Sequence, residues 1–228
     1  MKRRIIIVGG SKGIGKAIIN SLLPLSFVSN LSRTSPDIID DNLNHYEIDV
    51  LNDELPDIDN ADVLIYCPGS INLMPITRLS IEDFKSDYNI NVVGAVRAIQ
   101  KYLPVIKNGN NPSIVLFSTV ATKLGMPFHS SIAASKSAIE GLGKSLAAEL
   151  APNVRVNVIA PTVTNTSLAR KLLRNEKAIA NMRERHPLKK FLEPNEVAEM
   201  VSFLISDSAS SITGQIFNLD CGIVSIKA

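Results

Sequence analysis

The chain has 228 residues, a formal net charge of +2 at pH 7, and 45% hydrophobic residues. This length and composition suit one large domain with a single extensive core. The nearly balanced charge gives no sign of the basic surface typical of nucleic-acid binders, and the basic runs at 171–174 and 183–190 are interpreted as solvated helix faces. We therefore expect no nucleic-acid partner.

The two cysteines, Cys67 and Cys221, lie far apart and match no metal-binding or redox spacing. Two reduced thiols are typical of a cytoplasmic protein. The apolar run that follows the basic start is too short for a signal peptide, and no apolar stretch is long enough to span a bilayer. The sequence thus predicts a soluble cytoplasmic protein with no metal site and no membrane partner.

Short apolar runs and helical periodicities alternate along the chain. The predicted strands are residues 5–8, 27–31, 45–50, 63–67, 114–117, 154–159 and 215–219. The predicted helices are residues 17–23, 80–103, 131–150 and 194–204. Pro24 and Pro104 are expected to end the first two helices, and Ser130 or Ser131 to cap the third.

This alternation predicts an α/β fold in which a doubly wound, Rossmann-like parallel sheet carries helices on both faces. No internal repeat, low-complexity tract or linker interrupts it, so residues 1–228 are expected to form a single domain. The least regular segment is 162–191, where Pro187 breaks the helical patches. The pattern is compatible with both a loop insertion and a lid over a substrate or cofactor.

A glycine-rich segment, GGSKGIG, lies between the first predicted strand and the first predicted helix. Glycines at this place let the backbone turn sharply, so that a pyrophosphate can approach the N–H groups at the start of the helix. The position therefore predicts a nucleotide site. The predicted binding residues in the loop are Gly9, Ser11, Lys12, Gly13, Ile14 and Gly15.

The end of the second strand bears on the choice of nucleotide. NAD sites usually have an acidic side chain there, which binds the ribose 2′-hydroxyl. Here the strand ends in Asn30-Leu31-Ser32-Arg33, without a carboxylate. Arg33 together with Lys12 can hold a 2′-phosphate, so the sequence favours NADP over NAD. The alternative is that both are ordinary surface cations.

Over nearly its whole length, the chain resembles the short-chain dehydrogenase/reductase family, and especially the reductases of 3-oxoacyl carrier proteins. The loop matches the family's Gly-x-x-x-Gly-x-Gly, and Asp49-Val50 matches the pair that contacts adenine. Gly69 is the one residue kept from the family's Asn-Ala-Gly, which here reads Cys-Pro-Gly. The segment between Asp49 and Asp62 is shorter than usual, so the helix expected there is reduced to a turn.

The resemblance also implies the catalytic residues. Asn91, Thr119 and Lys136 fall on the asparagine, serine and lysine of the family's catalytic tetrad. The segment RVNVIAPTVTNT matches the part of the family that closes over the nicotinamide, which makes its members cofactor-binding candidates, as is Lys136. These members are Pro161, Thr162, Thr164 and Thr166.

Ile132 occupies the position of the tetrad tyrosine, and no tyrosine lies between Tyr102 and the C-terminus. In the family's mechanism that hydroxyl transfers the proton, and its loss costs about 10²–10⁴ in rate. The nearby candidate substitutes are His129 and Ser131. In a regular helix Ser131 lies about 140° around the axis from Lys136, whereas Ile132 is only about 40° away.

Three functions are compatible with these residues. The first is an NADP(H)-dependent oxidoreductase that interconverts a small carbonyl and an alcohol with an altered proton-transfer step. The second is an inactive NADP(H)-binding module, such as a sensor or a partner subunit, and the third is a non-redox elimination or isomerisation. The helices at 80–103 and 131–150 are apolar on several faces, and the family commonly pairs them, so a homodimer or homotetramer is expected.

Overall fold

The computed structural model describes residues 2–227. Seven strands form one parallel sheet in the order β3-β2-β1-β4-β5-β6-β7. Their bounds are β1 (Arg3–Val8), β2 (Ser26–Ser32), β3 (Leu43–Glu47), β4 (Val63–Tyr66), β5 (Ser113–Phe117), β6 (Arg155–Pro161) and β7 (Ile216–Leu219). The order reverses direction between β1 and β4, which confirms the predicted doubly wound α/β fold.

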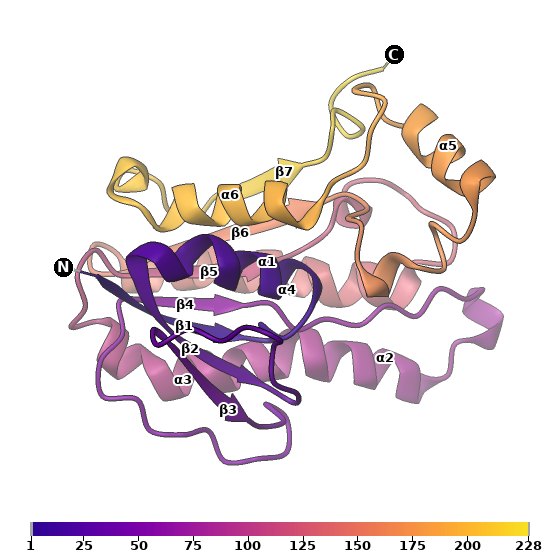
Figure 1. Ribbon diagram of the computed structural model, residues 1–228. Helices are drawn as coiled ribbons and strands as arrows, with labels where there is room; N and C mark the ends of the chain where they lie inside the picture. The colour runs from indigo at the N-terminus through magenta and orange to yellow at the C-terminus, as the bar shows by residue number, and fades with distance from the viewer. Residues whose placement is uncertain (1, 228) are drawn as a thin grey trace.

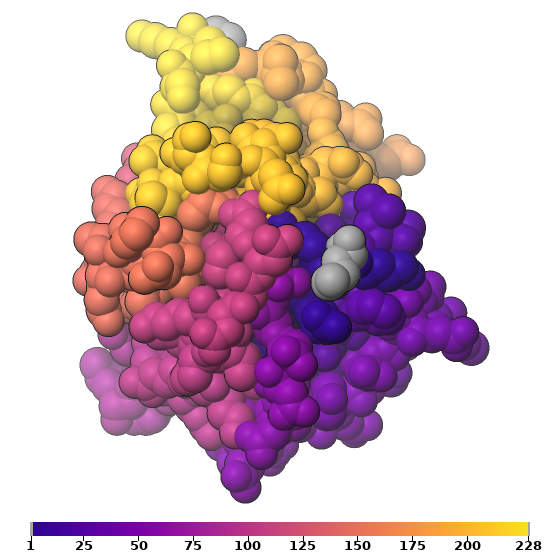
Figure 2. Space-filling model, turned by 90° about the vertical axis from the view of Figure 1, so that its left-hand side faces the viewer, coloured from indigo at the N-terminus to yellow at the C-terminus, as the bar shows by residue number. Residues whose placement is uncertain are grey.

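The longer helices are α1 (Gly13–Leu22), α2 (Ile81–Tyr88), α3 (Gly94–Ile106), α4 (Ser130–Leu150), α5 (Glu176–Glu184) and α6 (Pro194–Ile205). Helices α1 and α6 cover one face of the sheet and α3 and α4 cover the other, whereas α5 lies away from the sheet (Figure 1). A π-helical turn, Asn89–Val93, joins α2 to α3. Figure 2 shows the molecule from the left-hand side of Figure 1, the end at which β1 begins.

Alternate residues of the strands supply two separate cores. In β1, Ile6 and Val8 belong to the core under α3 and α4, whereas Ile5 and Ile7 belong to the core under α1 and α6. Successive side chains of a strand point to opposite faces, so a strand covered on both faces must be apolar throughout. The uninterrupted Ile-Ile-Ile-Val run in β1 is the sequence signature of this burial.

The predicted boundaries were wrong at the third strand, found at Leu43–Glu47 instead of 45–50, and at the ends of two helices. Pro104 does not end its helix, because α3 continues to Ile106 and Lys107 N–H still donates to Leu103 O at 3.0 Å. A proline in the last turn removes only its own N–H and leaves the later hydrogen bonds possible. The N-cap of α4 is His129, without a side-chain cap, rather than Ser130 or Ser131.

The short segment between Asp49 and Asp62 contains turns and no helix, as predicted. Segment 162–191 has a 3₁₀ turn, Ser167–Ala169, followed by α5. Within residues 2–227, no helix is both long and apolar enough to cross a membrane. The same residues contain no cluster of three or more His, Cys, Asp or Glu side chains arranged to hold a metal.

Candidate functional site: a cleft at the carboxyl ends of the strands

The predicted site residues lie along a cleft of about 1240 Å³ at the carboxyl ends of the strands. The loops that follow β1, β2, β4, β5 and β6 all contribute to its wall. In open α/β sheets, ligands bind at this edge where the strand order reverses. Every predicted site residue lines the cleft except Asn91 and Ser131, which lie behind its wall.

The glycine-rich loop leads from β1 into α1 and leaves the start of that helix open to an anion. Lys12 is the N-cap of α1 and makes no side-chain cap, and the first turn has no acidic residue. Gly13 has φ +53, a left-handed conformation that glycine adopts without strain. The free N–H groups and the helix dipole therefore form a site suited to a phosphate.

Asn30 fixes this loop to the neighbouring strand, a role that sequence reasoning missed. It is fully buried in β2, and its Oδ1 accepts a hydrogen bond from Gly10 N–H at 2.9 Å. Its Nδ2 donates to Ser32 Oγ at 3.0 Å. The signal in the sequence is a polar residue at the centre of an otherwise buried strand.

Replacing Gly15 by alanine is expected to weaken dinucleotide binding. A Cβ at Gly15 would lie 2.3 Å from Gly9 O, so the phosphate loop has to shift. Overpacking of this kind costs about 1–3 kcal/mol, which corresponds to roughly 5- to 150-fold in affinity if the strain falls on the bound state. Calorimetric titration with NADPH measures the loss. Gly141→Ala is the control, because a Cβ at Gly141 meets nothing within 4 Å.

Cations and backbone groups, rather than a carboxylate, surround the end of β2. Arg33 and Lys12 are both exposed and both line the cleft. Asp49 also lines it, but its carboxylate accepts hydrogen bonds from Leu51 N–H at 2.9 Å and Asn52 Nδ2 at 3.1 Å. Asp49 therefore caps its own turn, while the cations next to β2 remain available for an anionic group.

Lys136 is a buried cation in the wall of the cleft. Its Nζ donates to Phe117 O at 2.9 Å, which holds the side chain against the end of β5. Burial lowers the pKa of Lys136 to about 8, while the nearby Cys67 and Asp87 act in the opposite direction. A buried ammonium is destabilised because it loses water, and a neighbouring carboxylate compensates for part of that loss.

Thr119 and Asn91 approach the same region from β5 and from the π-helical turn. Thr119 lines the cleft, and its Oγ1 accepts a hydrogen bond from Ala121 N–H at 3.3 Å. Asn91 is fully buried, and its Nδ2 donates to Asp87 O at 2.7 Å. Asn91 Oδ1 has no partner among the described residues, and a Cβ at Gly69 would lie 3.3 Å from it.

Ile132 lines the cleft one helical turn before Lys136 and is almost fully buried. Among residues 2–227, no tyrosine contributes to the cleft wall. Tyr66 is buried, and its hydroxyl donates to Ile90 O at 2.6 Å. The cleft therefore presents an aliphatic side chain beside its buried cation, and no phenol.

The two candidate substitutes for the missing acid are placed differently. His129 lines the cleft, and its Nδ1 lies 2.7 Å from Pro127 O, which can only accept, so Nδ1 carries a proton. Ser131 is buried behind the wall, and its hydroxyl donates to Asp87 Oδ2 at 2.6 Å. The Ser131 hydroxyl is therefore committed to a carboxylate and not directed at the cleft.

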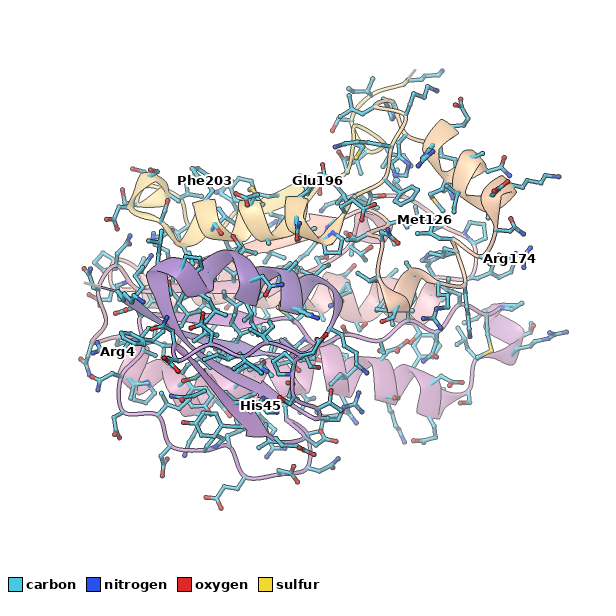
Figure 3. All side chains as sticks on the ribbon, in the orientation of Figure 1. Arg4, His45, Met126, Arg174, Glu196 and Phe203 are labelled. Carbon is cyan, nitrogen blue, oxygen red and sulfur yellow. The ribbon has the colours of Figure 1, made fainter. Side chains whose placement is uncertain are left out.

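A buried histidine ties segment 162–191 back to its own first residue, Thr162, which directly follows β6. His186 Nε2 lies 2.8 Å from Thr162 Oγ1, and its Nδ1 lies 2.7 Å from Met182 O. Because the carbonyl only accepts, Nδ1 donates to it and Nε2 accepts from Thr162. Figure 3 shows Arg174 of segment 162–191 and Met126 of the cleft wall on the same side of the molecule.

Known proteins similar to this chain are reductases and dehydrogenases. A family model described as enoyl-(acyl carrier protein) reductase matches residues 48–224. The 3-oxoacyl-(acyl-carrier-protein) reductase of Thermotoga maritima is 37% identical over 164 residues, which cover 72% of this chain and 66% of that protein. Carbonyl reductase (NADPH) 2 of Sus scrofa is 27% identical, with 96% and 95% covered.

Solved structures resemble the whole chain. The aldohexose dehydrogenase of Thermoplasma acidophilum has a TM-score of 0.90 at 31% identity, covering 100% of this chain and 95% of that one. A short-chain dehydrogenase family protein of Francisella tularensis has a TM-score of 0.90 at 26% identity, covering 99% and 100%. A 4-hydroxyisoleucine dehydrogenase complexed with NADH has a TM-score of 0.89 at 27% identity, covering 99% and 100%.

Proposed function

The chain belongs to the short-chain dehydrogenase/reductase family, and from this premise we propose that it is an NADP(H)-dependent oxidoreductase that interconverts a small carbonyl and an alcohol. The observation that carries the proposal is the shared cleft, where the phosphate loop, Thr119 and the buried Lys136 meet. We further propose that Ile132 stands at the position of the family's catalytic tyrosine. The proton-transfer step must then differ from that of the family.

The residues along the cleft fit a dinucleotide from end to end. The open start of α1 suits the pyrophosphate, Asp49 and Val50 border the adenine position, and Lys136 suits the nicotinamide ribose. The family's segment that closes over the nicotinamide corresponds to Pro161 through Thr166, at the end of β6. When bound, NADP(H) supplies or accepts a hydride at its nicotinamide ring.

Similar proteins include one named for NADPH and one complexed with NADH, so the comparisons leave the choice of cofactor open. The proposal of NADP(H) therefore rests on the cations Arg33 and Lys12 in the cleft wall.

Arg33→Asp is expected to weaken NADPH binding by roughly 10- to 100-fold and to affect NADH far less, since it removes a charge-assisted bond to the 2′-phosphate and adds repulsion. Fluorescence titration of both nucleotides measures the ratio. Arg170→Asp, at an exposed lid position outside the cleft wall, is the control. Equal losses for both nucleotides would contradict the assignment.

At the substrate end, Thr119 can donate its hydroxyl to a carbonyl oxygen and so orient it. Lys136 is held by Phe117 O and keeps positive charge beside the reacting oxygen. Ile132 excludes water but neither donates a proton nor binds an oxyanion. Wild-type turnover should therefore be slow compared with relatives that have the phenol.

The absence of a phenol from the described cleft wall also favours a second candidate function, an NADP(H)-binding module without turnover. Both candidates predict NADPH binding, and only the first predicts substrate-dependent oxidation of NADPH. A panel of small aldehydes and ketones, with NADPH absorbance and alcohol product both recorded, separates them. No binding of either nucleotide up to millimolar concentration would contradict both.

The proposed assembly is a homodimer or homotetramer through the α2–α3 segment, which corresponds to the predicted helix at 80–103, and through α4. In the α2–α3 segment, Tyr88 and Val93 are exposed at 47% and 38% of their surface. Light scattering of the purified protein tests the assembly independently of activity.

A further inference from the structure

Asp87 is a fully buried carboxylate in α2 that the proposed function does not yet use. Its Oδ1 accepts hydrogen bonds from Ser70 Oγ and from Asn72 Nδ2, the latter at 3.1 Å. Its Oδ2 accepts from Ser131 Oγ at 2.6 Å. Three donors converge on this one carboxylate, which is how a buried ionised group is kept in a protein interior.

Ser70 connects this carboxylate to the cleft. It follows Gly69 in the loop after β4, is partly exposed, and lines the cleft. Its hydroxyl hydrogen points to Asp87, so the oxygen has a lone pair left to accept another proton. Asn91 Nδ2 lies 3.4 Å from the same oxygen and fixes its position from the other side.

Lys136 is a titratable group that senses the charge of Asp87. The carboxylate acts on the buried ammonium electrostatically, second to burial and together with Cys67. The charges of the Asp87 carboxylate and the Lys136 ammonium therefore stabilise each other in the part of the cleft wall that contains Ile132. Gly69, which precedes Ser70, lies beside Lys136, since a Cβ at Gly69 would be 3.7 Å from Lys136 Nζ.

A second serine–carboxylate pair in the same wall is built differently. Ser118 also lines the cleft, and its Oγ donates to Glu140 Oε1 at 2.7 Å, but Glu140 forms an ion pair with Lys123 at 3.0 Å. Thr122 Oγ1 donates to the same Glu140 oxygen at 2.6 Å. Glu140 is therefore a carboxylate neutralised by a cation, whereas Asp87 is hydrogen-bonded only to the neutral donors Ser70, Asn72 and Ser131.

We propose that Ser70 and Asp87 form the proton relay that takes the place of the missing tyrosine, an inference that rests on the proposed oxidoreductase function. In alcohol oxidation, the substrate O–H bond breaks and its proton passes to Ser70 Oγ, while the Ser70 proton passes to Asp87 Oδ1. The substrate carbon loses its hydride to NADP⁺, so the alcohol becomes a carbonyl and NADP⁺ is reduced. Reduction of the carbonyl follows the same path in reverse, and solvent restores the protonation state of Asp87 between turnovers.

In this relay Ser70 touches the substrate, and Asp87 is a positioning and proton-accepting group behind it. Ser70→Ala is expected to lower kcat by roughly 10²-fold or more, within the usual range for a positioned acid or base, and to leave the NADPH Kd within about threefold. Ser70→Thr, which keeps a hydroxyl, is expected to retain most of the activity. Asp87→Asn, which can still accept a hydrogen bond from Ser70 but cannot take its proton, is expected to match Ser70→Ala.

The decisive experiment repeats Asp87→Asn in an Ile132→Tyr background. If Asp87 carries the proton, the new phenol makes the relay redundant, and Asp87→Asn should cost less than about fivefold in that background against about 10²-fold alone. A merely structural role would give the same loss in both backgrounds, and that result would overturn the inference. Glu140→Gln is the matched control, since it removes a buried carboxylate outside the relay and should leave kcat unchanged in folded protein.

A second readout needs no turnover and no cofactor. Asp87 raises the pKa of Lys136 by its charge, so in Asp87→Asn the Lys136 ammonium should deprotonate at lower pH than in wild type. Titration of isotope-labelled lysine by nuclear magnetic resonance measures this shift in the pKa of Lys136, and no shift would overturn the relay.

Failure of the relay and failure of the proposed function can be told apart. If NADPH binds but wild type reduces and oxidises nothing, the proposed function fails. If wild type turns over and Asp87→Asn leaves kcat unchanged, only the relay fails.

Discussion

The Ile132→Tyr variant is expected to reduce carbonyl substrates with NADPH at least about 10²-fold faster than wild type. Ile132 lies one helical turn before Lys136 and faces the cleft, so a phenol placed there points toward the buried ammonium. That charge stabilises the phenolate and makes the hydroxyl a better acid at neutral pH. The gain is measured as kcat and kcat/KM in steady-state assays.

Ile132→Phe is the control for this prediction, because it adds the ring without the hydroxyl. It should give no gain and instead reduce space in the cleft, so that any change appears mainly in KM. Equal activity in the Phe and Tyr variants would show that shape, not proton transfer, limits the wild-type rate. A tyrosine variant no faster than wild type would contradict the assignment of position 132 to the proton donor's place.

Lys136 gives the second large expected effect, on cofactor binding. In wild type, NADPH affinity should fall as pH rises through about 8, because burial lowers the pKa of Lys136 to that value from 10.5. The sign follows from the charge: below this pH the ammonium donates to the ribose, and above it the neutral amine loses a charge-assisted hydrogen bond. Such a bond contributes about 1.5–3 kcal/mol, or roughly 10- to 150-fold in affinity.

Lys136→Met should bind NADPH with that weaker affinity at pH 7 and show no decline between pH 7 and pH 9. Lys123→Met is the matched control, because Lys123 is exposed, pairs with Glu140 and does not line the cleft. Its Kd should follow the wild-type pH profile. A decline near pH 8 that persists without Lys136 would assign the titration to another group.

The sequence predicted the fold because local patterns coincided with global requirements. The apolar run at 5–8 is buried on both faces of the sheet, and the glycine-rich loop GGSKGIG joins β1 to α1, where the pattern predicts a strand-to-helix turn. Helix ends were less predictable. Pro104 lies in a last turn where its missing N–H does little harm, and Ser131 is used by Asp87 rather than by the start of α4.

The linear motifs identified the wall of the cleft but not the groups behind it. Lys136 and Thr119 belong to segments of recognisable spacing, and both line the cleft. Asp87 and Ser70 are separated by a loop and lie in no recognised motif, so their contact arises only when α2 packs beside the loop after β4. A charged residue on a helix face reads as solvent-exposed in a sequence, and only the fold shows that it is buried.

The central claim is that the wild-type protein is an NADP(H)-dependent oxidoreductase despite Ile132. The most direct measurement is NADPH oxidation by the wild-type protein across a carbonyl panel, with the alcohol product quantified in the same reaction. We predict slow, substrate-dependent oxidation of NADPH in which one alcohol molecule forms for each NADPH consumed. Tight NADPH binding with no alcohol formed by wild type, while Ile132→Tyr reduces the same substrates, would contradict it and identify a binding protein that has lost the reaction.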